Sequence, residues 1–443
     1  MVNALLKSPG MLAFLTFMTF WSLAASHVIP SLALPSDLHS RQAPKLKAGA
    51  WLMTYKPSGS SQTYKGSLRV TSDSSSLHIS GDWYNSTAQP NPADGIPILP
   101  RSNYYAFIRA TKLTSGNNRA FTMGLEAFRF KGFHEINNYT VWDDSSAPLD
   151  GGYITDLSPT TAPTGYPDSR NYFEGDMKII GSGSVAGRFT MGWVNEYVRK
   201  ITLEIGSVSG MEVPNKDISG QRTWKNIFSE VGWDIKIVLG KTDIPEPTNT
   251  NLPAGMWKSE QQHAAMLQYR KETDFDKEWK YYLLLVKRLE GVERGAMFDP
   301  GYEYNSIPRE GTAVANEWIV GTIWDGTNDT GRNWGTATGK KFVTVHDAWF
   351  RTCVHEVGHF FNLQHPPEFV QGVMTDTQTY VDAGRDGLTA QKFPENVGSE
   401  SLKFTDSDKF LMMHRPDLFL RPGFVKFGAA AQNSEPPEAA PLR

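Results

Sequence analysis

One short stretch, residues 351–365, constrains what this chain can fold into more than any other part of the sequence. It contains His355, Glu356 and His359 in the pattern H-E-x-x-H, and His365 follows shortly afterwards. Two residues four positions apart lie about 40° apart around an α-helix, so both imidazoles can point at one metal ion. The glutamate projects beside them. The stretch therefore predicts a helix that carries a metal site on one face.

The donor atoms of this stretch suit a zinc ion with one open coordination position. Neutral imidazoles are good zinc ligands, and three protein ligands leave the fourth position to water. A carboxylate beside that water can take its proton. Only 10 of the 443 residues are histidine, so chance would produce the pattern in roughly one such chain in a few thousand. We predict that His355, His359 and His365 bind Zn²⁺ and that Glu356 is the catalytic base.

The same helix should have a separate face for the protein core. At about 100° per residue, the apolar side chains that fall in one arc opposite the histidines are Phe350, Cys353, Val354, Val357, Phe360 and Phe361. Cys353 is the only cysteine, so no internal disulfide can form, and we interpret it as a small buried hydrophobic residue. Asp347 is placed to cap the N-terminus of the helix.

The stretch resembles the zinc-binding motif of the metzincin clan of zinc endopeptidases, H-E-x-x-H-x-x-G-x-x-H followed by a methionine turn. The matching positions are His355, Glu356, His359 and His365. Asn362 stands where the clan has a glycine that ends the helix in a left-handed conformation. Asparagine is the non-glycine residue that adopts this conformation best, so we expect Asn362 to support the turn towards the third ligand.

A second segment fits the resemblance. Residues 372–375 read Gly-Val-Met-Thr and follow the third histidine, as the methionine turn does in metzincins. The resemblance implies that Met374 forms an apolar floor beneath the zinc ligands. In several metzincins a tyrosine after this turn stabilises the oxyanion, and Tyr380 is the nearest candidate. The clear match covers only residues 351–375, so it indicates the clan rather than a family within it.

The N-terminus is typical of a secretion signal. Lys7 is a positive charge near the start, residues 11–23 are apolar and residues 24–26 are small. This pattern predicts a signal peptide over residues 1–26. An uncleaved membrane anchor is the alternative, but the apolar run is shorter than the roughly 20 residues that a span needs. Residues 27–48, rich in proline, serine and leucine, are interpreted as a leader, a linker or a short pro-segment.

Sequons and charge describe the expected surface. Sequons at Asn85, Asn138 and Asn328 agree with a secreted glycoprotein. The net charge of −3 is small and no basic face is evident, so we expect no nucleic-acid partner. Asp325 and Asp329 lie with Asn328 in a polar loop, where a plain surface loop is favoured over a calcium site because the spacing matches no calcium-binding loop.

Residues 49–231 consist of short apolar-alternating runs bounded by glycine, serine, asparagine or proline, which predicts a β-sandwich or β-barrel domain. The runs that carry the pattern best lie at residues 68–70, 77–79, 105–108, 121–123 and 201–205. Aromatic residues in this region would suit a glycan-binding face, although core and cross-strand packing explains them more simply. Glycan contact therefore stays an alternative role for this domain.

Residues 232–427 change to a mixture of strands and helices. A strand, a helix and three further strands are predicted at residues 233–239, 256–269, 281–286, 317–324 and 341–345, ahead of the zinc helix. This order resembles the N-terminal subdomain of metzincins. A helix at 406–414, capped by Asp406 or Ser407, should close the domain. Residues 428–443 are rich in alanine, proline and glutamate and are predicted to be disordered.

The sequence therefore predicts an α+β chain in which an all-β domain precedes a metzincin-like zinc-protease domain with a mixed, twisted sheet and helices. We expect a secreted or extracellular endopeptidase that uses Zn²⁺ and acts on a protein or peptide substrate. The alternative is an extracellular glycan- or protein-binding protein with a structural or inactive zinc site. Glu356 favours the enzyme, because a structural site needs no such carboxylate. A zinc hydrolase of a non-peptide amide is a further alternative.

Overall fold

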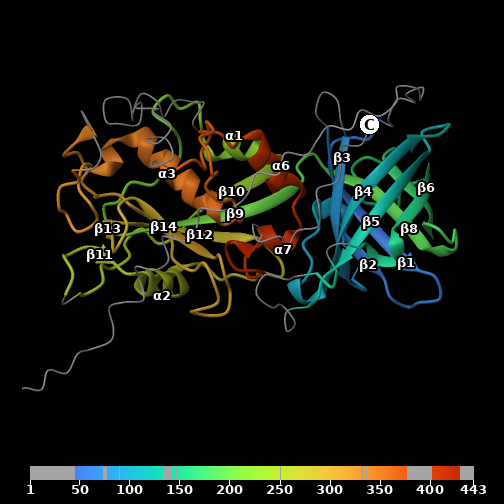
Figure 1. Ribbon diagram of the computed structural model, residues 1–443, viewed down its shortest axis with the longest axis horizontal. Helices are drawn as coiled ribbons and strands as arrows, with labels where there is room; N and C mark the ends of the chain where they lie inside the picture. Colours follow the sequence, from blue (N-terminus) through green and yellow to red (C-terminus); the bar gives the residue numbers. More distant parts are fainter. Residues whose placement is uncertain are drawn as a thin grey trace, which may run out of the picture. The chain divides into compact units, whose positions relative to one another are not determined.

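The computed structural model describes residues 45–72, 77–88, 90–132, 142–144, 147–249, 251–330, 334, 337–376 and 402–429 (Figure 1). The predicted signal peptide, most of the segment that follows it, Asn138, Tyr380 and the tail beyond residue 429 lie outside these residues. Within the described ranges, none of the helices combines the length and the apolar character needed to cross a bilayer.

The N-terminal part of the chain forms a closed antiparallel barrel, which decides between the two predicted β architectures. Each strand pairs with the next one in sequence, and β1 pairs with β8 to close the sheet. The strands are β1 (Gly49–Pro57), β2 (Tyr64–Ser72), β3 (Leu77–Asn85), β4 (Tyr104–Ser115), β5 (Phe121–Arg129), β6 (Tyr153–Pro159), β7 (Tyr172–Ile179) and β8 (Val185–Asn195). Short 3-10 helices lie in the connections, at Pro92–Asp94, Arg101–Asn103 and Leu149–Gly151.

The alternation of side chains along the barrel strands explains its core. On β1, Trp51, Met53 and Tyr55 belong to the large apolar cluster of the barrel, whereas Ala50 and Leu52 pack in a separate, smaller cluster. Successive side chains of a strand point to opposite faces, so one face fills the barrel and the other lies outside it. The aromatic residues named here are buried, and glycan contact stays an untested prediction.

The second sheet has the strand order β10-β9-β12-β15-β14. Its strands are β9 (Arg199–Ser207), β10 (Trp233–Leu239), β12 (Lys280–Val286), β14 (Gly295–Met297) and β15 (Gly311–Ala315). The first four strands in the order run parallel, and β14 is antiparallel to β15. Every residue of β12 is buried, as its continuous apolar run predicted for a strand covered on both faces.

One strand lies in a different sheet from the one that the sequence suggested. The sequence pattern places residues 201–205 in the β-rich domain, whereas β9 pairs with β10 and β12 in the second sheet. The change from barrel to second sheet therefore falls between Asn195 and Arg199, not at residue 232. Alternation identifies a segment as a strand, but it contains no information about which strand will be the partner.

Two predicted strands of the second sheet are wrong. Residues 317–324 form turns joined to the following segment by an isolated bridge between Ile319 and Lys341, and Phe342–Thr344 is a 3-10 helix. The apolar residues of these segments pack against one another and do not form strands. Trp318 contacts the rings of Trp334 and Phe342 in a local aromatic cluster. An apolar run thus filled a core without pairing as a strand.

The described residues contain the helices α1 (Trp224–Ser229), α2 (Ser259–Tyr269), α3 (His346–His359), α6 (Asp406–His414) and α7 (Asp417–Leu420). β11 (Met256–Trp257) lies directly before α2 and pairs with β13 (Arg288–Leu289), which follows β12, in a two-stranded parallel sheet. Because residues 256–257 are paired in that sheet, α2 begins later than predicted.

Both helix caps predicted from the sequence are wrong. Thr405 caps α6 by accepting a hydrogen bond from the backbone N–H of Asp408, so neither Asp406 nor Ser407 is the capping residue. Asp347 lies in the first turn of α3 but accepts a hydrogen bond from the backbone N–H of Ile218 instead of capping its own helix. Asp347 therefore makes a hydrogen bond to a distant segment in place of the N-cap hydrogen bond expected within its own helix.

His414 of α6 is a buried histidine that is neutral in the folded chain. Its ring nitrogens lie 2.7 Å from the Thr71 hydroxyl and 3.0 Å from the Ser80 hydroxyl. Burial lowers the pKa of His414 well below its usual range, and nearby cations lower it further. The unfolded chain binds a proton here that the folded chain does not. This site therefore reduces the free energy of unfolding as the pH falls below about 6.5.

We expect His414→Gln to weaken this pH dependence. The histidine removes up to about 1.4 kcal/mol of stability per pH unit below about pH 6.5, whereas glutamine binds no proton. Urea unfolding of both proteins at several pH values between about 7.5 and about 5.5 measures the difference. His346→Gln, at a position whose side chain is 23% exposed, is the matched control. Equal pH dependence in wild type and His414→Gln would contradict the prediction.

Candidate metal centre

Helix α3 carries two of the three predicted metal ligands and separates them from the core. The apolar arc expected from the sequence is buried, including Phe350, Cys353, Val354 and Val357. Burial raises the pKa of the Cys353 thiol, which agrees with its interpretation as a buried hydrophobic residue. The opposite side of the helix presents the histidines.

Asn362 reverses the chain after α3, as predicted. Its φ of 56° is in the left-handed region. Its side-chain amide donates to the carbonyl of Phe419 in α7 and accepts from the backbone N–H of Gly428, at 2.7 and 2.8 Å. A glycine could adopt the same backbone conformation but could not make these bonds. Asn362 therefore fixes the turn that returns His365 to the helix.

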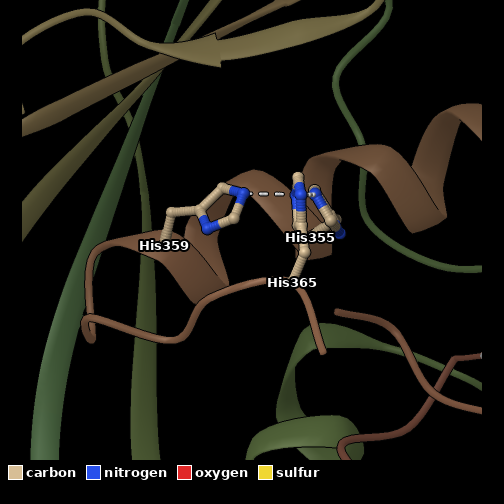
Figure 2. Close-up of side chains that lie close together, drawn as sticks. All are labelled: His355, His359 and His365. Carbon is tan, nitrogen blue, oxygen red and sulfur yellow. Dashed lines mark hydrogen bonds between the residues drawn. The ribbon is translucent and has the colours of Figure 1, made fainter. Parts of the chain in front are cut away.

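The three imidazoles converge on one point (Figure 2). The Nε2 atom of His355 lies 3.0 Å from Nε2 of His365 and 3.2 Å from Nε2 of His359. Zinc–nitrogen bonds of about 2.0–2.1 Å in tetrahedral geometry place two donors roughly 3.3 Å apart. The spacing of these nitrogen atoms thus suits a single zinc ion.

The other ring nitrogen of each histidine is held by an acceptor. Nδ1 of His355 donates to the carbonyl of Val373 at 2.7 Å, and Nδ1 of His359 donates to the carbonyl of Leu363 at 2.8 Å. Nδ1 of His365 lies 3.3 Å from a carboxylate oxygen of Asp376. With the proton on Nδ1, each Nε2 keeps a lone pair for a metal ion.

The protonation state of the ligands agrees with this arrangement. Burial lowers the pKa of all three histidines, to about 4 for His359 and well below the usual range for His355. The imidazoles repel one another when charged, which adds to the effect. They are therefore neutral near pH 7, which is the form that binds metal.

Glu356 is buried beside strand β14. A Cβ atom added to Gly295 would lie only 2.5 Å from Cγ of Glu356, so the glycine leaves the space that this carboxylate occupies. Burial raises the pKa of Glu356 to about 8, although the nearby Arg294 acts to lower it. This pKa keeps the side chain mostly protonated near pH 7, and a cation held by the three histidines would shift it to the carboxylate form that can accept a proton.

Met374 packs against Gly358 of α3. Gly358 lies between the ligands His355 and His359 in the sequence. A Cβ atom on Gly358 would lie 2.3 Å from Sδ of Met374, so only glycine lets the methionine approach this closely. Met374 is buried. Arg351 of α3 donates to the carbonyls of Gly372 and Thr375, which fastens the methionine segment to the helix. Met374 is thus placed where it would form an apolar surface beneath the three histidines.

Three residues of this centre were not predicted from the sequence. Gly358 lies inside the motif, and its position next to His359 is a signal that could have been used. Gly295 and Asp376 give no such signal, because strand pairing and chain reversal bring them to the site. The carboxylates of Asp325 and Asp329 are not among the described groups whose geometry suits a metal ion.

Comparison with known proteins provides no assignment: no family model, curated protein or solved structure matches this chain.

Proposed function

We propose that this chain is a secreted, zinc-dependent endopeptidase of metzincin type. One observation carries the proposal: three neutral imidazoles direct their Nε2 atoms at one point, next to a buried carboxylate. The sequence motif adds support, because the same four residues match the metzincin pattern. A purely structural zinc site would have no use for Glu356.

Zinc held by the three histidines would polarise the scissile carbonyl and acidify the attacking water. The chain supplies the remaining chemistry. The carboxylate of Glu356 accepts the proton of the water and passes it to the leaving amine. The carbonyl of Val373 and the carboxylate of Asp376 keep the Nδ1 protons of His355 and His365 in place, which orients both rings.

The surroundings of the centre suit an extended peptide. Strand β14 stands at the end of the sheet order, so one of its sides faces away from its neighbour β15. An extended substrate can pair with such an edge, and Gly295 would place it beside Glu356. A cavity of about 540 Å³ next to His365 has a wall that includes Leu363, Val370 and Leu411 and could receive an apolar substrate side chain.

Secretion and glycosylation are part of the proposal. The N-terminal sequence predicts a signal peptide. Asn85 and Asn328 are exposed, so a glycan could be attached at either sequon. Mass spectrometry of the secreted protein would identify both its N-terminus and its glycans.

Zinc content and peptide cleavage test the proposal together. Wild type should cleave peptides from a broad library, and a zinc chelator should abolish the cleavage. We expect His359→Ala to bind one zinc ion fewer per chain and to lose cleavage, because two remaining imidazoles hold zinc poorly. His346→Ala, on the same helix but outside the centre, is the matched control and should keep both properties.

The same experiment separates the alternatives. Wild type that binds zinc yet cleaves no peptide would overturn the proposal in favour of a binding protein or of a hydrolase for another amide. Cleavage that survives both zinc removal and His359→Ala would place the catalytic centre elsewhere.

A further inference from the structure

A second group of metal-binding side chains lies apart from the histidines of α3. It comprises His263 of α2, Asp299 after β14 and Glu310 before β15, and each residue offers one donor atom within 4.8 Å of the others. All three residues are buried. Neither the zinc motif nor the proposed peptidase chemistry uses them.

His263 is a buried residue whose hydrogen-bonding groups are unsatisfied within the described residues. Only 4% of its surface is exposed, and neither of its ring nitrogens makes a hydrogen bond with any described residue. Its Nδ1 atom lies 4.0 Å from a carboxylate oxygen of Asp299, which is too far for a hydrogen bond. The ring stacks on Tyr304 with centroids 4.6 Å apart, which fixes its plane. A buried donor or acceptor without a partner destabilises the folded state.

The two carboxylates are oriented by hydrogen bonds. Asp299 accepts from the backbone N–H groups of Glu310 and Gly311 at 2.9 and 3.1 Å. Glu310 accepts from Arg270 and from the side-chain amide of Asn305. Ligating carboxylates are commonly held by such hydrogen bonds, which set the direction of their free lone pairs.

The charge of the group is incompletely balanced. Arg270 pairs with Glu310, but among the described residues no lysine or arginine forms an ion pair with Asp299. A cation bound between these side chains would balance the charge of the Asp299 carboxylate.

We propose that His263, Asp299 and Glu310 bind a divalent transition-metal ion such as Zn²⁺. One imidazole nitrogen and two carboxylate oxygens form a donor set for such an ion, whereas calcium and magnesium prefer oxygen ligands alone. Metal–ligand bonds of about 2.0–2.2 Å require donors roughly 3–3.5 Å apart, so the side chains have to close in by only about 1 Å. Water completes the coordination.

The ion connects α2 to the segment between β14 and β15. Asp299 follows β14 closely, and β14 contains Gly295, which lies against Glu356. The ion therefore stabilises the fold at the far end of the strand that borders the proposed active site. Its role is structural, and it does not depend on the proposed peptidase activity.

Zinc binding can be measured after removal of the first centre. The full chain with His355→Ala/His359→Ala is freed of metal, dialysed against Zn²⁺ and analysed for zinc per chain and for melting temperature. We expect one bound zinc ion and a rise of a few degrees in the melting temperature when zinc is added. Adding His263→Gln to this background should abolish both effects, whereas adding His346→Gln as the matched control should preserve them.

Asp299→Asn in the same background is the second variant, because it keeps the shape of a buried side chain and lowers its affinity for metal. It decides the outcome if His263→Gln does not fold. A background protein that binds no zinc would overturn the proposal. Zinc binding that persists unchanged in His263→Gln, or in Asp299→Asn, would also overturn it. None of these results depends on whether the chain cleaves peptides.

Discussion

Replacing Glu356 by glutamine is expected to reduce kcat/KM for peptide cleavage by roughly 10²–10⁴-fold while zinc remains bound. Glutamine has nearly the same shape and fits the space beside Gly295, but its amide does not accept a proton from water. General base catalysis contributes an effect of this size, which corresponds to roughly 3–5 kcal/mol of the activation barrier. Glu356→Gln therefore tests general base catalysis separately from zinc binding.

The measurement combines steady-state cleavage with zinc content and melting temperature. The zinc content should equal that of wild type, since Glu356 is not one of the converging ligands. Glu317→Gln is the matched control, because Glu317 forms a surface ion pair with Lys341, and it should change none of the three quantities much. Activity within tenfold of wild type in Glu356→Gln would exclude Glu356 as the base.

The convergence of the three histidines could be predicted because their arrangement depends on short-range geometry. Helical spacing alone directs His355 and His359 to the same side. A left-handed residue after the helix is enough to return the chain, and Asn362 has the expected φ of 56°. These relations hold over a few residues, so the sequence contains all the information that they need.

Gly295 shows why the rest of the centre could not be predicted. Strand β14 is only Gly295–Met297, and it has neither an apolar run nor an alternating pattern. Its position is set by pairing with β15, in which Gly295 lies opposite Val314. The contact with Glu356 follows from that pairing and from the packing of α3 against both strands. Local patterns do not encode such contacts.

The burial of Arg69 in the barrel could not be predicted for a different reason. Arg69 on β2 belongs to a pattern in which polar residues are expected to face solvent, yet its side chain is 1% exposed. It forms ion pairs with Asp82 on β3 and with Asp417 of α7, which is 348 residues away in sequence. A buried charge requires a partner. The sequence alone did not indicate where that partner would come from.

Asp417→Asn is expected to reduce the free energy of unfolding by about 3–5 kcal/mol, because it removes the carboxylate between two buried arginines. Asp417 pairs with Arg69 and with Arg199 of β9, and it accepts a hydrogen bond from the hydroxyl of Tyr84. Burial acts to raise the pKa of Asp417, but Arg199 and Arg69 outweigh it and lower the pKa to about 2. The folded state therefore depends on the charged carboxylate.

Urea unfolding of the full chain near pH 7 measures the loss. Asp82 can still pair with Arg69 in the variant. Most of the loss should therefore come from Arg199, which among the described residues forms a direct ion pair with Asp417 alone. Asp176→Asn is the matched control. Its ion pair with Arg188 is on the surface, where the side chain of Asp176 is 54% exposed, and such pairs contribute about 0–1 kcal/mol. If the two variants lose equal stability, the buried arginines do not depend on Asp417.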